Sequence, residues 1–435
     1  MEPKRLVHDE FLVAYFRERI LPLVCTSTAK KVMIAESLDE FNAYKYNFQK
    51  EIEATYKVYL NLESLHRSMR TLGASEEKIG KLLSVLRKLQ QFLFHIPYYR
   101  DHLPHQLRVY LLGCYIMESN MGFFTRQLPS KYAEMISALL GKNDEDHRLN
   151  ILDSLRRGLE CNPQVIYDAW SIAGLCHDLG YCVQGIKNVA ANLCDAYKEL
   201  VPELNMQMSP QILPDPSMQS QISAFGNALK NLYPKSGEEL AKLVSALSQD
   251  MNHGIWSCFF LASEDLANKI EQNTITLKNR MSNLTLWDLV SDFNLVSGDR
   301  FAADLLPVLY AEALIAIAFH DKPSLRYLSP LAFLLVVSDT LQEWNRVGNL
   351  STEIDQQRRD VYLTMENNGK GLSIKSEIYT YDCSPASLYQ KIVYNFQPGS
   401  ELSRVNLSMI SSEFIQGSSF IISVGPSPTP LILTA

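Results

Sequence analysis

Several histidines and aspartates of this chain lie beside strongly apolar segments, where they could bind a divalent metal ion. His177 and Asp178 directly follow the apolar stretch 171–176, and Gly180 comes next as a residue that favours the end of a helix. Burying an imidazole and a carboxylate is costly unless they are paired or bound to a metal. A His-Asp dipeptide alone is weak evidence, because another begins at His320, so the apolar setting of the first pair carries the argument.

Three further histidines and one distal aspartate share this setting. They are His105 at the start of an expected helix, His253 ahead of the apolar run 258–262, His320 after the apolar run 313–319, and Asp339 after the segment 333–338. Neutral imidazoles combined with carboxylates are the ligands expected for iron, manganese, zinc and similar divalent ions. Each residue alone is better explained as a hydrogen-bonded or ion-paired side chain, but all of them together favour a metal site.

Two more residues complete the candidate site. His102 lies three residues before His105, and we expect it either beside the ligands or at the surface. Arg346 follows Asp339 by seven residues and Glu343 follows it by four, so the three share one helical face. Arg346 could hold a phosphate through two parallel hydrogen bonds, or it could pair with Glu343, and the sequence does not choose between these roles.

The elements that must position these residues are predominantly helical, so the predicted fold class is mainly α. Apolar residues at three- to four-residue spacing predict a helical N-terminal region over 1–95 and a helical metal-binding domain over 96–350. A proline-rich stretch at about 201–223 predicts a surface insertion in this domain. Strand-like alternation predicts a small β or α/β appendage over 365–425, and the prolines of 426–435 predict a loose tail.

Individual elements can be predicted within these regions. The expected helices are 41–66, 76–94, 107–117, 165–179, 239–262, 305–319 and 328–344, and the expected strands are 372–374, 378–381 and 419–424. Ser75 is the expected N-cap of the second helix, since Glu76 and Glu77 suit a first helical turn.

Composition narrows the class of protein. The 435 residues carry a net charge of −7 and are 46% apolar, as in ordinary globular proteins. No apolar run is long enough to span a bilayer, and the charged N-terminus has no apolar signal region. The eight cysteines lack a C-x-x-C pair, which favours reduced thiols and a cytoplasmic location without membrane association. The acidic balance disfavours broad nucleic-acid binding but leaves a local basic groove open.

The order of the candidate ligands resembles that of the HD-domain superfamily of metal-dependent phosphohydrolases, over residues 100–350. The signature of this superfamily is a His, a His-Asp pair and a distal Asp on separate helices of a bundle. The resemblance implies two divalent metal ions, with manganese, iron, magnesium, zinc and nickel as open choices. It assigns His105, His177, Asp178 and Asp339 to the first ion, and His253 and His320 to a second ion, with Asp178 bridging the two.

The resemblance also implies a function. We expect hydrolysis of a nucleotide or another small anionic phosphoester by a bridging water that the two metals activate. Asp178, Arg346 and His102 are the candidate catalytic residues, and Arg108 could also neutralise developing charge. We further expect that the N-terminal helices could support a homo-oligomer. Which phosphorylated substrate is used does not follow from the fold.

Three alternatives remain open. Some relatives with the same ligand order hold a di-iron pair and oxidise small hydroxylated substrates, and several of these have a Lys close behind the His-Asp pair. Here Leu179, Gly180 and Tyr181 follow, and the nearest Lys is Lys187, so Tyr181 could plug or shape the site instead. An HD-type nuclease is not excluded, although no arginine-rich aromatic groove is visible. A degenerate regulatory domain is disfavoured, because all six ligands are present.

Overall fold

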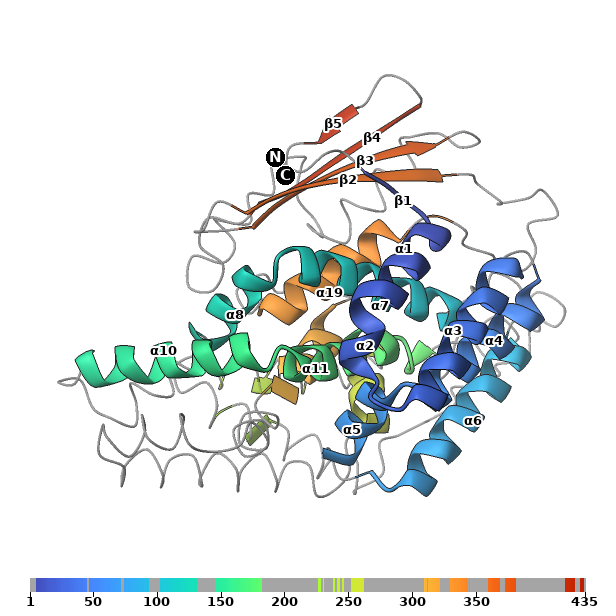
Figure 1. Ribbon diagram of the computed structural model, residues 1–435, viewed down its shortest axis with the longest axis horizontal. Coiled ribbons are helices and arrows are strands. Elements are labelled where there is room, and N and C mark those ends of the chain that lie inside the picture. Colours follow the sequence, from blue (N-terminus) through green and yellow to red (C-terminus); the bar gives the residue numbers. More distant parts are fainter. Residues whose placement is uncertain are drawn as a thin grey trace, which may run out of the picture.

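A computed structural model describes most of the helical part of the chain and a small sheet. The described residues are 5–44, 47–71, 74–93, 102–130, 145–181, 226–227, 230, 238, 241–242, 245, 252–261, 309–310, 312–320, 329–342, 344, 359–367, 372–380, 419–426 and 431–433. Helices form the main body and the sheet lies along one side of it (Figure 1). The predicted mainly α fold with a small β-containing part is therefore confirmed.

The helices begin close to the N-terminus. Those before residue 95 are α1 (Asp9–Tyr15), the π-helical turn η1 (Phe16–Ile20), α2 (Leu21–Val24), α3 (Thr28–Ala43), α4 (Phe48–Asn61), α5 (Glu63–Thr71) and α6 (Glu76–Leu93). Those after it are α7 (His102–Ser119), α8 (Met121–Ser130), α10 (Glu145–Cys161), α11 (Gln164–Cys176), α15 (His253–Leu261) and α19 (Pro330–Leu341), and 312–319 is also helical.

Local capping explains where several of these helices begin. Ser75 accepts a hydrogen bond from the backbone N–H of Lys78 at 3.2 Å, as its predicted role as the N-cap of α6 requires. The expected helix 41–66 is instead divided among α3, α4 and α5. Asn47 starts α4, because its side chain accepts from the N–H of Lys50 at 3.3 Å.

Helices α7, α11 and α19 form the centre of the body. All residues of α11 from Val165 to Cys176 are buried, so the helix has no solvent-facing side. Helix α7 packs against α11 at Gly113, where a Cβ atom would lie 1.9 Å from the ring of Trp170. The indole N–H of Trp170 donates to the carbonyl of Tyr110 at 3.1 Å. Gly113 and Trp170 thus fix the close contact between α7, which carries His105, and α11, which precedes His177.

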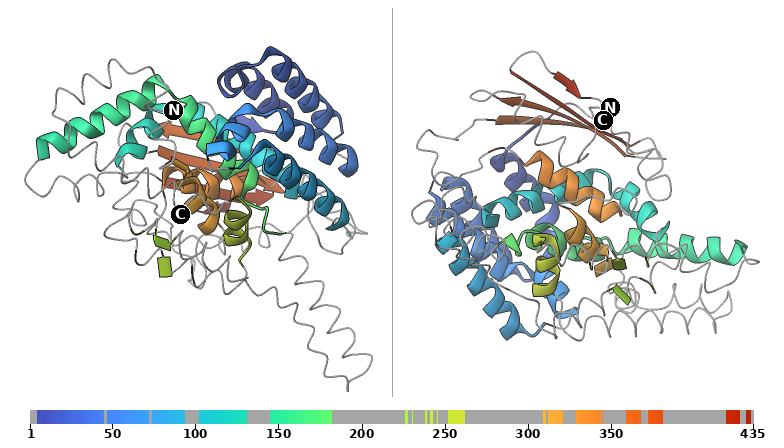
Figure 2. Two further views of the ribbon diagram at one scale, coloured as in Figure 1. Left: turned by 90° about the horizontal axis from the view of Figure 1, so that it is seen from below. Right: turned by 180° about the vertical axis from the view of Figure 1, so that it is seen from behind.

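The N-terminal helices share one hydrophobic core with this centre. Helix α5 packs on α11, whereas α1, η1, α4 and α6 pack on α7. Both views in Figure 2 show α10 extending from one end of the body and α3, α4 and α6 at the other. The N-terminal region therefore builds part of the surroundings of α7.

The sheet has the strand order β1-β2-β3-β4-β5. Its strands are β1 (Arg5–Val7), β2 (Arg359–Asn367), β3 (Leu372–Thr380), β4 (Ser419–Pro426) and β5 (Leu431–Leu433). Strands β3 and β4 are parallel and the other neighbours are antiparallel. Alternate residues of β2 are buried against the helices, namely Val361, Leu363 and Met365.

The sheet corrects two expectations. The N-terminal region is not helical throughout, because β1 pairs with β2 and places Arg5 opposite Leu363. The tail 426–435 is not loose throughout, because β5 pairs with β4 and places Leu433 opposite Ile422. Each of these strands has only three residues, too few for alternation to reveal them in the sequence.

Some expectations lie outside the described residues. These are the surface insertion at about 201–223, together with Arg346 and Glu343. Within the part of the chain that the structure describes, none of the helices combines the length and the apolar character needed to cross a bilayer.

Candidate metal centre

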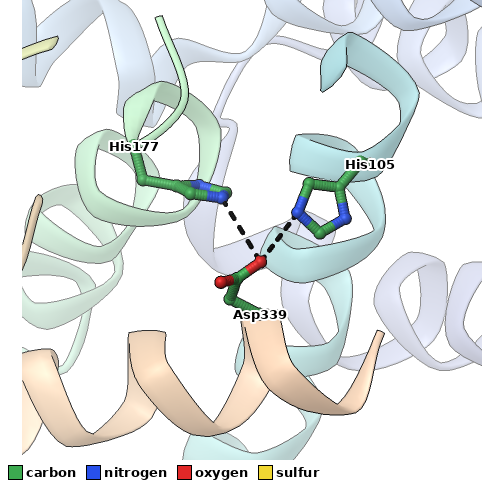
Figure 3. A group of neighbouring side chains, drawn as sticks. All are labelled: His105, His177 and Asp339. Carbon is green, nitrogen blue, oxygen red and sulfur yellow. Dashed lines mark hydrogen bonds and ion pairs between the residues drawn. The ribbon is translucent and has the colours of Figure 1, made fainter. Parts of the chain in front are cut away.

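Three elements bring His105, His177 and Asp339 together. His105 lies in the first turn of α7, His177 directly follows α11, and Asp339 lies near the end of α19. Both imidazoles point toward the Asp339 carboxylate (Figure 3). His105 Nε2 is 2.8 Å and His177 Nε2 is 3.8 Å from Asp339 Oδ1. The three ligand atoms lie within 4.8 Å of one another, a spacing that could hold a metal ion.

A second group adjoins the first through Asp178. Asp178 Oδ1 lies 3.5 Å from His177 Nε2, 3.4 Å from His320 Nε2 and 3.6 Å from His253 Nε2. His177, Asp178 and His320 form another cluster whose ligand atoms lie within 4.8 Å of one another. The other oxygen, Asp178 Oδ2, is 3.7 Å from His105 Nε2. The Asp178 carboxylate therefore lies between the two groups of imidazoles.

Three of the imidazoles are oriented by the same kind of contact. In each, Nδ1 faces an oxygen that can only accept, so Nδ1–H donates to it and Nε2 is the ring atom turned toward the carboxylates. The pairs are His177 with the Gly174 carbonyl (3.1 Å), His320 with the Ile317 carbonyl (2.7 Å), and His105 with the Gln342 side-chain oxygen. This arrangement is typical of histidines that bind a metal through Nε2.

The Nε2 atom of His177 is the sharpest sign of a ligand. His177 is completely buried, and its Nε2 makes no hydrogen bond to any described residue. Burial, aided by the nearby His320 and His105 and opposed by Asp178 and Asp339, lowers the pKa of His177 to about 4. The ring is therefore neutral at pH 7. A buried lone pair between two carboxylates is costly unless a cation occupies the space.

The two carboxylates are ionised. Burial acts to raise the pKa of Asp178, but His177, His102 and His320 outweigh it and hold this pKa well below its usual range. The pKa of Asp339 is also lowered, since burial is outweighed by the hydrogen bond and charge of His105. The buried neutral imidazole of His177 beside two charged carboxylates fits a divalent transition metal.

His253 completes the second group. Its Nε2 lies 3.1 Å from His320 Nε2, and burial, followed by the charge of His320, lowers its pKa well below the usual value. Two glycines allow this approach. A Cβ atom on Gly180 would lie 1.9 Å from the His253 carbonyl oxygen, and one on Gly254 would lie 2.4 Å from that of Ile317. Only glycine fits where these backbones meet.

His102 lies beside the ligands rather than at the surface. Its Nδ1 is 3.1 Å from Asp178 Oδ2, and the residue is 8% exposed. The half-buried ring of Tyr181 stacks between two imidazoles, with centroids 4.1 Å from His102 and 3.8 Å from His253. Tyr181 thus forms one wall of the candidate centre, as the sequence left open.

Arg108 does not take part in the centre, contrary to our suggestion that it could neutralise developing charge. It is fully buried and forms ion pairs with Asp9, at 3.1 Å, and with Glu51. Its guanidinium also lies 4.9 Å from the centre of the Phe41 ring. Although it follows His105 by only one helical turn, its guanidinium lies against Asp9 and Glu51 of the N-terminal helices instead of beside the ligands.

Two glutamines near the ligands were missed. The side chain of Gln342 orients His105. The side-chain oxygen of Gln106, in the amide orientation that satisfies its neighbours, accepts from the backbone N–H of Asp178 at 3.2 Å. Their only signal in the sequence is a polar residue within or directly after an apolar helix. Such residues become informative only when the fold shows what they contact.

Comparison with known proteins gives no family: no family model, curated protein or solved structure matches this chain.

Proposed function

We propose that this protein is a metal-dependent phosphohydrolase that uses two divalent ions. The observation that carries the proposal is the buried lone pair of His177 Nε2, which makes no hydrogen bond to a described residue and faces the carboxylates of Asp178 and Asp339. The order of the ligands in the sequence, which resembles that of the HD-domain superfamily, supports it independently.

The ligands divide between two positions. His105, His177, Asp178 and Asp339 would hold the first ion, and Asp178, His253 and His320 would hold the second. Asp178 can serve both, since its two oxygens face different imidazoles, Oδ2 toward His105 and Oδ1 toward His253 and His320. His177 lies near both groups, and we assign it to the first because of its approach to Asp339.

Two bound divalent ions supply an activated water and neutralise charge on a phosphoryl group. The residues of the chain would determine where the ions and the substrate lie. The side chain of Asp339 is 25% exposed, whereas those of His105 and His177 are at most 1% exposed, so Asp339 marks a side from which solvent reaches the ligands. His102 beside Asp178 is suited to orient a phosphoryl oxygen or its leaving group.

The substrate is proposed to be a small phosphorylated molecule, with nucleotides as the leading class. His177 is neutral and the carboxylates of Asp178 and Asp339 are ionised, so these three ligands carry a net negative charge and would repel a phosphate unless metals were bound. Attraction must therefore come from the metals and from local cations, among which Arg346 stays a candidate.

A cytoplasmic location is supported by the described cysteines, which are free thiols.

A panel of hydrolysis assays tests the function. Protein purified without chelators is supplied with Mn²⁺ and offered nucleoside triphosphates, cyclic nucleotides, phosphomonoesters and short single-stranded DNA and RNA, and the products are separated by chromatography. We expect hydrolysis of at least one small substrate, and its loss in Asp178→Ala. Oxygen consumption with small polyols would favour the oxygenase instead, and cleavage of the nucleic acids would favour the nuclease.

A further inference from the structure

His105 differs from the other oriented histidines in where its partner comes from. His177 and His320 each bond to a carbonyl three residues earlier in their own segments. His105 bonds through Nδ1 to the side chain of Gln342, which is 237 positions away in sequence. The orientation of His105 therefore depends on tertiary structure, whereas that of the other two is largely local.

Gln342 is itself held in one orientation. Its side-chain oxygen accepts from His105 Nδ1, and its Nε2 donates to the carbonyl of Trp344 at 2.7 Å. Gln342 is completely buried and Trp344 is 3% exposed. A rotated amide would place a donor against the N–H of His105 and an acceptor against a carbonyl, so the buried amide has one favourable state.

Trp344 connects this pair to the N-terminal helix α1. Its indole N–H donates to Asp9 Oδ1 at 2.7 Å. Asp9 is 1% exposed and also accepts from Arg108 Nε, at 3.1 Å to each carboxylate oxygen. Arg108 lies on α7, one turn after His105. Asp9 therefore contacts both the helix that carries His105 and the segment that orients its ring.

We propose that Asp9, acting through Trp344 and Gln342, positions His105 for the first metal ion. This inference rests on the proposed metal site. It makes the N-terminal segment, which lies outside the HD-like region of the sequence, a part of the metal centre. Asp9 is a positioning residue, because it touches neither the ligand atoms nor a substrate.

The proposal predicts a selective effect. Breaking a hydrogen bond between Asp9 and Gln342 should free the His105 ring and weaken binding of the first ion, to which His105 contributes. Binding of the second ion should change much less, because His320 keeps its carbonyl partner Ile317. A general loss of packing would weaken both ions together.

Trp344→Phe is the sharpest variant, since it keeps an aromatic ring and removes the indole N–H that reaches Asp9; the ring volume lost with it is monitored through the melting temperature. Glu51→Gln is the matched control, because Glu51 pairs with the same Arg108 but does not contact Trp344 in any described interaction. Metal-free protein is titrated with Mn²⁺ and with Co²⁺, and the affinity of each ion and the visible Co²⁺ spectrum are recorded with the melting temperature.

We expect wild type and Glu51→Gln to bind the first ion equally. In Trp344→Phe, this ion should bind about tenfold more weakly and the Co²⁺ spectrum should change, while the affinity for the second ion stays the same. Unchanged affinity in Trp344→Phe, or equal weakening in Glu51→Gln, would overturn the positioning role. Absence of metal binding in wild type would instead overturn the proposed function. If Trp344→Phe does not fold, Gln342→Met, which removes both amide hydrogen bonds, decides by the same criteria.

Discussion

The ring of Tyr181 stacks on the ring of His253, with centroids 3.8 Å apart and planes inclined by 25°. The backbone N–H of Tyr181 donates to the carbonyl of Asp178 at 3.1 Å, so the position of Tyr181 is tied to the shared carboxylate residue. The stack restricts rotation of the His253 ring. Tyr181 therefore helps to aim His253 Nε2 at Asp178.

Tyr181→Leu should weaken binding of the second metal ion. Loss of an aromatic contact worth about 0.5–1.5 kcal/mol corresponds to a roughly two- to tenfold weaker affinity. Tyr181→Phe keeps the ring and should bind both ions like wild type. Titration with Mn²⁺, followed by electron paramagnetic resonance, distinguishes the two. A Tyr181→Phe variant as weak as Tyr181→Leu would show that the hydroxyl, not the stack, matters.

Gly180→Ala should destabilise the protein. The added Cβ would lie 1.9 Å from the backbone carbonyl oxygen of His253, which cannot move without displacing α15. We expect a loss of about 1–3 kcal/mol in urea unfolding. Gly80→Ala in the interior of α6 is the control, because its Cβ would meet nothing within 4 Å. That variant should gain about 0.5–1 kcal/mol from helix propensity, and a similar stability of both variants would contradict the close approach at Gly180.

The stability of the metal-free protein should fall as the pH is lowered from 7 to 4. In the unfolded chain His177 takes up a proton near pH 6.5, whereas burial keeps it neutral in the folded protein until about pH 4. Unfolding therefore binds a proton in this range, and the depressed pKa corresponds to roughly 3 kcal/mol of lost unfolding free energy. The lowered pKa values of Asp178 and Asp339 act in the same direction, but below pH 4.

Chemical denaturation at several pH values in the presence of a chelator measures this effect. His177→Leu removes one such group and should make the dependence between pH 7 and 4 clearly shallower, while His253, whose pKa burial also lowers, retains part of it. A pH dependence in His177→Leu as steep as in wild type would assign the acid sensitivity to other residues.

The candidate ligands could be selected from the sequence because each one begins, interrupts or ends an apolar helix, a signal that is local. His105, His177 and Asp339 therefore stand out before their contacts are known. The pairing of Asp9 with Trp344 joins residues 335 positions apart, and the bond between Gln342 and His105 spans 237. No local pattern encodes such contacts. In the sequence, Asp9 and Gln342 look like ordinary polar residues near a helix end.

The prediction that Arg108 could neutralise developing charge was wrong for the same reason. In the sequence, an arginine one turn after His105 looks available to a phosphate, whereas in the fold two acidic residues of the N-terminal helices, Asp9 and Glu51, pair with it. Strand β1 was missed because its pairing partner, β2, lies more than 350 residues later.

Metal content is the most direct test of the proposed two-metal centre. Protein purified without chelators, and again after dialysis against Mn²⁺ and then against buffer, is analysed by mass spectrometry for metal per chain. We predict about two divalent ions per chain in wild type, and their near-complete loss in the double variant His177→Leu with Asp178→Asn, which removes the central ligands of both groups. Wild-type protein that folds but binds no divalent ion under either condition would contradict it.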